Sequence, residues 1–152
     1  MKAQVLIRNG QRKVKLDREG ITAISRYVLE REGLEGRWQL SFYFVGDSKS
    51  RELNREYLRR DRPTDVLAFS MLEGPDTEEG LLGDVVVSTH RAISNAERFG
   101  TSAEEEITRY VVHGVLHLLG YDDMGEERDR MKKREDVLLE GIRRKRWRSL
   151  AS

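Results

Sequence analysis

Apolar and polar positions along the chain follow two periods, one of two residues and one close to 3.6 residues. Residues 3–8 alternate and are rich in branched side chains before Asn9-Gly10, which predicts an edge strand or the start of a hairpin. The short apolar-rich segments 65–70 and 85–89 predict buried strands. The whole pattern predicts strands at 3–8, 38–45, 65–70 and 85–89, and helices within 17–33, 49–59, 92–99, 102–119 and 126–146.

The segment 102–119 carries the strongest helical pattern. Ser102 and Glu105 have the spacing of a capping box at its start, and Gly120 follows its end. Apolar residues lie on most faces of this helix, so we expect it to be buried at the centre of the molecule. The chain has 152 residues and neither a repeat nor a linker. Its elements must therefore share one core, which predicts a single domain over residues 1–152.

The charge balance narrows the classes of function. Lys and Arg number 28 against 27 Asp and Glu, so no global field attracts nucleic acid or anionic lipid, and a polyanion site must arise from local clustering. Cysteine is absent, which excludes disulfides, thiolate metal sites and cysteine nucleophiles. No stretch approaches the ~20 apolar residues of a membrane span, and the N-terminal apolar run is too short for a secretory signal. We therefore expect a cytoplasmic protein that does not contact membranes.

The residues that carry chemistry are concentrated in the motif HGVLHLLGYDD, which begins at His113. His113 and His117 are four residues apart, so on a helix both imidazoles lie on one face, close enough to bind one ion at ~2.0 to 2.1 Å. Gly120 can adopt a positive φ and reverse the backbone, which would bring Asp122 or Asp123 back towards the pair. We predict a zinc-type site on His113, His117 and Asp123, with a fourth position left for water.

The same ligand spacing occurs in metzincin zinc proteases, which makes a metalloprotease an alternative. Such a protease carries its glutamate general base directly after the first histidine, where this chain has Gly114. Peptide hydrolysis is therefore disfavoured. The glycine would either leave space beside the metal or allow close helix packing, and the sequence leaves both explanations open.

Other motifs accompany the histidine motif in a fixed order. They are LNREY from Leu53 with Asp61, PTDVL from Pro63 with Phe69, and Leu82-Gly83-Asp84, which together span roughly residues 40 to 140. The set resembles the bacterial YbeY family of endoribonucleases. The resemblance implies a single α+β domain with a mixed sheet of about four strands and about five helices, a zinc ion on three histidines, and cleavage of single-stranded RNA. It also implies maturation of ribosomal RNA 3′ ends and ribosome quality control, with the ribosome or ribosomal proteins as partners.

The chain departs from the family pattern at two positions. The family normally has histidine as the third ligand, where this chain has Asp123. A carboxylate would make the ion a weaker Lewis acid and could favour a divalent metal other than zinc. The family also places an arginine directly after the tyrosine of LNREY, where this chain has Leu58. The phosphate-contact role that the resemblance implies therefore passes to Arg59.

Basic residues around that position form a candidate RNA contact. Arg55, Arg59, Arg60 and Arg62 fall within eight residues and could bind phosphate oxygens. Acidic residues interrupt the cluster, and a solvated helix face would have the same composition. A second basic run, 143–148, suggests another contact with RNA or the ribosome, although basic residues also suit a helix C-terminus.

The working hypothesis is hydrolysis of phosphodiester bonds in single-stranded RNA. His113 and His117 would hold the ion, and Arg59 would offset the charge that develops on the phosphoryl group. Asp65 and Asp84 are candidates for supporting either the site or the fold. A different class of function also fits the motifs, namely a ribosome-binding module whose metal is only structural.

Overall fold

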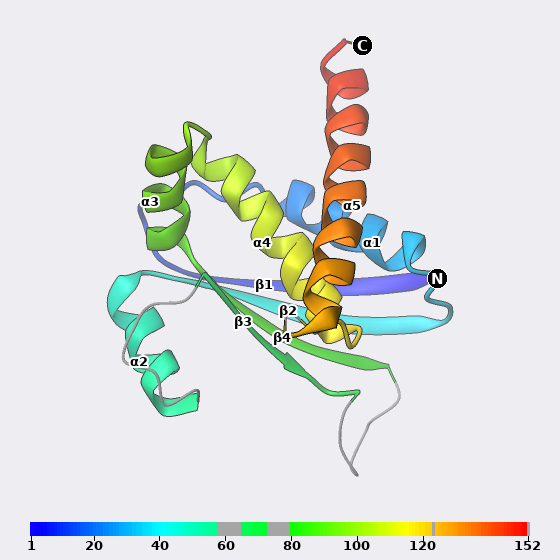
Figure 1. Ribbon diagram of the computed structural model, residues 1–152, viewed down its shortest axis with the longest axis horizontal. Coiled ribbons are helices and arrows are strands. Elements are labelled where there is room, and N and C mark those ends of the chain that lie inside the picture. Colours follow the sequence, from blue (N-terminus) through cyan, green and yellow to red (C-terminus); the bar gives the residue numbers. More distant parts are fainter. Residues whose placement is uncertain (58–64, 73–79, 123, 152) are drawn as a thin grey trace.

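A four-stranded sheet with four helices on one face forms the body of the computed structural model, which describes residues 1–57, 65–72, 80–122 and 124–151 (Figure 1). The elements in chain order are β1 (Lys2–Gly10), α1 (Arg18–Arg31), β2 (Arg37–Val45), α2 (Asp47–Tyr57), β3 (Val66–Ser70), β4 (Leu81–Ser88), α3 (Thr89–Phe99), α4 (Ala103–Leu118) and α5 (Glu126–Ala151). Figure 1 shows α1, α3, α4 and α5 above the sheet, whereas α2 lies lower, at the end of β2, and contacts α3 through Asp47 and His90.

The sheet has the strand order β1-β2-β4-β3 and is mixed. β1 pairs with β2 and β2 with β4 in parallel, while β3 runs antiparallel to β4. The predicted α+β class, with about four strands and five helices, is confirmed. β1 is an edge strand as predicted, but it does not start a hairpin, because α1 carries the chain over to a parallel β2.

The prediction that residues 65–70 form a buried strand is wrong in one respect. β3 lies at the other edge of the sheet, where it has a strand neighbour on one side only. Leu67 is its one buried residue, and the remaining four are half-buried. A short edge strand of apolar residues has the same sequence pattern as an interior strand, so the pattern alone could not distinguish them.

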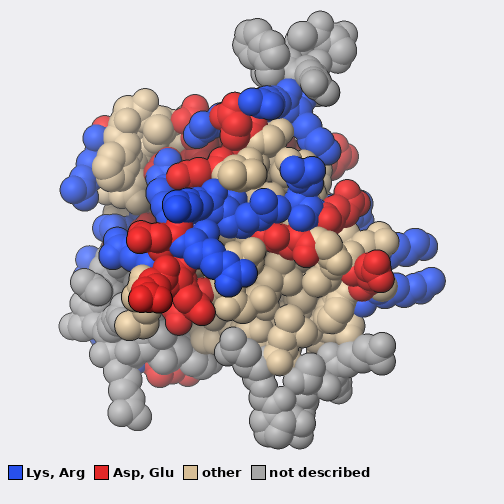
Figure 2. Space-filling model, turned by 45° about the vertical axis from the view of Figure 1, so that its right-hand side comes forward, with Lys and Arg blue, Asp and Glu red and all other residues tan. Residues whose placement is uncertain are grey.

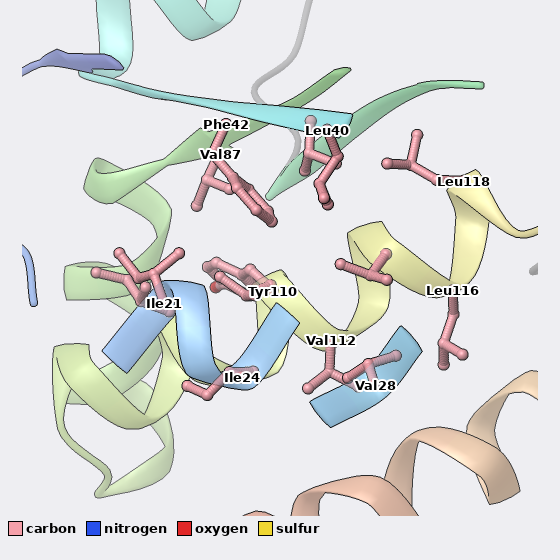
Figure 3. Close-up of a cluster of buried hydrophobic side chains, with 14 of the residues drawn as sticks. Ile21, Ile24, Val28, Leu40, Phe42, Val87, Tyr110, Val112, Leu116 and Leu118 are labelled. Carbon is pink, nitrogen blue, oxygen red and sulfur yellow. The ribbon is translucent and has the colours of Figure 1, made fainter. Parts of the chain in front are cut away.

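α4 is the buried central helix that the sequence predicts. Its residues Val112 and Leu116 are fully buried, and Figure 3 shows side chains of α4 between those of α1 and those of the sheet. The helix begins as predicted, because the Ser102 side chain accepts a hydrogen bond from the Glu105 backbone N–H at 3.1 Å. This hydrogen bond satisfies one of the backbone N–H groups in the first turn of the helix.

α5 packs on α4 through a stripe of buried residues at helical spacing, Met131, Leu138 and Ile142. Figure 1 shows its N-terminal half beside the C-terminal half of α4, and its last turns rising away from the sheet. Over the part of the chain that the structure describes, none of the helices is both long and apolar enough to cross a membrane.

Tyr110 of α4 gives a pH-dependent prediction. Burial, with Asp65 nearby, raises the pKa of Tyr110 to about 12, although the hydrogen bond from Asn95 at 2.6 Å acts in the opposite direction. In the unfolded chain the tyrosine hydroxyl loses its proton near pH 10, whereas the folded state keeps the Tyr110 proton up to about pH 12. The folded state should therefore lose about 2 kcal/mol of stability as the pH rises from 10 to 12. Urea unfolding across this range should show the loss in the wild type and a smaller one in Tyr110→Phe. An equal loss in both would contradict the assignment.

Candidate metal centre

The last two turns of α4 place two imidazole rings together. His113 and His117 have their Nε2 atoms 3.1 Å apart, and their ring centroids are 4.7 Å apart in an edge-to-face arrangement. Both side chains are half-buried at the edge of an otherwise buried helix. The predicted convergence of the two histidines is confirmed as geometry.

Gly114, between the two histidines, allows α4 to approach the sheet closely. A Cβ atom at this position would lie 2.5 Å from Cγ1 of Val85 in β4 and 3.3 Å from Cγ1 of Val66 in β3. Both distances are shorter than ordinary carbon contacts. Of the two explanations that the sequence left open, close packing therefore accounts for this glycine. It also keeps the part of α4 between the two histidines close to β3 and β4.

Glu135 is a site residue that the sequence analysis missed. Its Oε1 atom lies 3.0 Å from Nδ1 of His113, and its side chain is only 7% exposed. Its other oxygen, Oε2, lies 3.7 Å from Nζ of Lys132. A sequence signal existed, because Glu135 stands four residues after Met131 and three before Leu138, on the buried stripe of α5. A carboxylate on such a stripe requires a partner.

The chain reverses after α4 as predicted. Gly120 has a φ of 99°, and the backbone N–H of Tyr121 donates to the Leu116 carbonyl at 3.1 Å. The hydroxyl of Tyr121 donates to Oε1 of Glu32 at 3.0 Å, and burial followed by this hydrogen bond raises the pKa of Tyr121. Arg134 of α5 donates to the same oxygen at 2.9 Å. The turn that leads to the predicted third ligand is thus held between α1 and α5.

The two acidic residues of this turn differ. Asp122 is exposed, and its side chain accepts a hydrogen bond from the Met124 backbone N–H at 3.1 Å. Asp123, the predicted third ligand, lies outside the described residues.

The histidine pair fits a zinc ion. With Zn–N bonds of ~2.0 to 2.1 Å, two ligand nitrogens of a tetrahedral site lie ~3.3 to 3.4 Å apart, close to the observed 3.1 Å between the Nε2 atoms. A hydrogen bond between the rings has a similar length. Among residues 1–57, 65–72, 80–122 and 124–151, no third His, Asp or Glu completes a group that could hold a metal. The fit therefore rests on the two imidazoles.

A cleft of about 570 Å³ opens beside His113. Its lining residues come from α4 and the first turns of α5, namely His113, Arg128, Asp129, Met131, Lys132 and Glu135. Arg128 and Lys132 thus flank a candidate metal ligand, at positions that depend on how α5 packs and that the sequence pattern does not predict. On the face shown in Figure 2, Lys and Arg side chains lie beside Asp and Glu side chains. The charge of each cation is therefore felt only by groups close to it.

The arginines predicted to contact RNA are only partly placed. Arg55 lies in the last turn of α2, which Figure 1 shows apart from the C-terminal half of α4. Arg59, Arg60 and Arg62 lie outside the described residues. The structure therefore leaves their predicted role untested.

Asp65 and Asp84 both have partners within the fold. Asp65 accepts a hydrogen bond from Nε of Arg91 at 3.0 Å, which links the start of β3 to α3. Asp84 accepts one from the Ser41 hydroxyl across β2 and β4. Of the two roles that the sequence analysis considered for them, these contacts support the role in the fold.

Comparison with known proteins covers almost the whole chain. The family model described as Endoribonuclease YbeY matches residues 6–143. A protein named Endoribonuclease YbeY from Pelotomaculum thermopropionicum is 43% identical over 144 residues, which cover 89% of this chain and 94% of that protein. The protein of the same name from Aquifex aeolicus is 41% identical over 143 residues, 91% of each chain.

This chain also has the same fold as a protein of solved structure. The solution structure of TM1509 from Thermotoga maritima has a TM-score of 0.64 and 28% sequence identity, over 96% of this chain and 93% of that one. The family-model match over residues 6–143 includes the histidine motif on α4. The chain belongs to the YbeY family.

Proposed function

We propose that this protein is a metal-dependent endoribonuclease that hydrolyses phosphodiester bonds in single-stranded RNA. The observation that carries the proposal is the pair of imidazole Nε2 atoms, 3.1 Å apart, beside a cleft that Arg128 and Lys132 also line. Membership of a family whose matching relatives are named endoribonucleases supports the same activity.

The proposed cofactor is one zinc ion on His113, His117 and Asp123. Two neutral imidazoles and a carboxylate are typical zinc ligands, and three protein ligands leave room for water or substrate. Because Asp123 replaces the family's histidine, another divalent metal is a second candidate. When bound, the ion would polarise a phosphoryl oxygen and activate a water for attack on phosphorus.

The protein's own residues would bind and orient the RNA. Arg128 and Lys132 stand next to His113 in the cleft, where a guanidinium and an ammonium can neutralise phosphate oxygens. We also propose that Arg59 contacts the reacting phosphate and that Arg55, Arg60 and Arg62 bind flanking nucleotides. A buried carboxylate, Glu135, holds the Nδ1 side of His113 and leaves the Nε2 side directed at His117.

The proposed substrate in the cell is ribosomal RNA. A role in 3′-end maturation and ribosome quality control, in the cytoplasm and in contact with the ribosome or its proteins, would follow from the family resemblance. The near balance of 28 Lys and Arg against 27 Asp and Glu favours such a partner-assisted role, because the net charge of the chain supplies little RNA affinity on its own.

Removal of the metal tests the proposed activity. The purified protein should cut an unstructured labelled RNA, leave the same sequence intact as DNA or as an RNA duplex, and lose at least about 10³-fold in rate with EDTA. Stepwise addition of zinc, manganese or magnesium should restore cleavage with one of them. Cleavage that persists in EDTA would contradict the proposal, and EDTA-sensitive cleavage of casein without action on RNA would favour the protease.

A further inference from the structure

The carboxylate of Glu135 contacts the imidazole ring of His113 at Nδ1. Glu135 Oε1 lies 3.0 Å from Nδ1 of His113, and a carboxylate oxygen at this place is a suitable acceptor for a hydrogen on Nδ1. With the hydrogen on Nδ1, Nε2 is the acceptor nitrogen of the ring, and this atom faces Nε2 of His117 at 3.1 Å. That is the tautomer and the direction that a metal ligand needs.

The packing of α5 holds this carboxylate in place. Met131 is 2% exposed and Leu138 is 1% exposed, and these two residues flank Glu135 on the face of α5 that is turned to the core. The Glu135 side chain is itself 7% exposed, so water competes little for its oxygens. Lys132 lies near Oε2, at 3.7 Å, which leaves Oε1 for the histidine.

We propose that Glu135 is a positioning residue that fixes the ring and the tautomer of His113 and thereby sets the affinity of the site for its metal. The inference rests on the proposed metal site and deepens it, because it makes metal affinity depend on the docking of α5 on α4. Residues that orient a metal-bound histidine in this way typically contribute 10- to 100-fold in affinity.

The test is a zinc titration of the whole protein against a competing chelator. Glu135→Leu removes the acceptor and keeps an apolar group of similar size on the buried stripe, so we expect it to fold and to bind zinc about 10- to 100-fold more weakly. Glu135→Gln retains an amide oxygen that can accept from Nδ1, and it should recover most of the affinity. The matched control is Asp136→Ala at the next position, where the side chain is 59% exposed, and its affinity should stay within about twofold.

Thermal unfolding in EDTA separates positioning from a purely structural role. The proposal predicts similar unfolding temperatures for Glu135→Leu and wild type without metal, and a smaller rise for the variant when zinc is added. A variant that unfolds earlier in EDTA but binds zinc as tightly as the wild type would overturn it. If Glu135→Leu does not fold, Glu135→Ala is assessed by the same criterion.

The two proposals fail in different ways. A wild-type protein that binds no zinc or other divalent metal contradicts the proposed function, and the inference about Glu135 falls with it. A wild type that binds the metal, with Glu135→Leu binding it equally well, contradicts only the inference.

Discussion

Replacement of His117 by alanine is expected to reduce cleavage of single-stranded RNA about 10³-fold while the protein remains folded. A bound metal contributes several kcal/mol to the stabilisation of a phosphoryl transition state, and about 4 kcal/mol corresponds to about 10³ in rate. Without His117 only one imidazole of the pair is left. The ring is half-buried in the last turn of α4, so its loss leaves the core intact. Single-turnover cleavage and circular dichroism on one preparation provide the measurement.

The matched control is the third histidine of the chain. His90 is in the first turn of α3, with a side chain that is 54% exposed and 3.9 Å from Asp47. His90→Ala should retain wild-type cleavage within about twofold. If the metal were only structural, as in the ribosome-binding alternative, His117→Ala would instead unfold the protein. A folded His117→Ala protein with full activity would exclude the catalytic metal site.

The second large effect is expected at Gly83 in β4. Its φ is 141°, which L side chains rarely adopt, and a Cβ atom would overlap the carbonyl oxygen of Phe69 and lie 2.8 Å from Cδ2 of Leu118. Backbone strain and overpacking each cost about 1–3 kcal/mol, so Gly83→Ala should lower the free energy of unfolding by about 3 kcal/mol. Urea unfolding followed by circular dichroism measures this loss.

A control separates this effect from that of any glycine-to-alanine change. A Cβ atom at Gly46 would meet no atom within 4 Å beyond its neighbours in the chain, so Gly46→Ala should change stability by less than about 0.5 kcal/mol. The position of Gly83 also bears on the site, because the hydroxyl of Ser70, its partner in β3, donates to the Leu118 carbonyl at 3.0 Å. A Gly83→Ala protein as stable as the wild type would contradict this prediction. It would show that β3, β4 and the end of α4 can move apart with little loss of free energy of unfolding.

The part of the site that lies on one helix could be predicted from the sequence. Four-residue spacing on a continuous helix determines that His113 and His117 share a face, whatever the rest of the fold does. The cap at Ser102 and the positive φ of Gly120 also depend on local chemistry, and both are as predicted. Each family motif is likewise a short stretch of sequence that can be recognised without the fold. Together the motifs indicate the same family as the whole-chain comparison.

The parts that depend on contacts between elements could not be predicted in this way. Glu135 reaches His113 across 22 positions of sequence only because α5 packs on α4. The same packing brings Arg128 and Lys132 to the cleft. The role of Gly114 required the position of Val85 on β4, and the parallel pairing of β1 required the path of α1. Hydrophobic periodicity contains none of these distances.

The most direct test of the account is the metal content of three proteins purified in parallel, wild type, His117→Ala and Asp123→Ala, with RNA cleavage measured on the same samples. We predict one divalent metal per wild-type chain, almost none in either variant, and loss of cleavage in both. Wild-type metal content and cleavage in the two variants would contradict a catalytic centre at this end of α4.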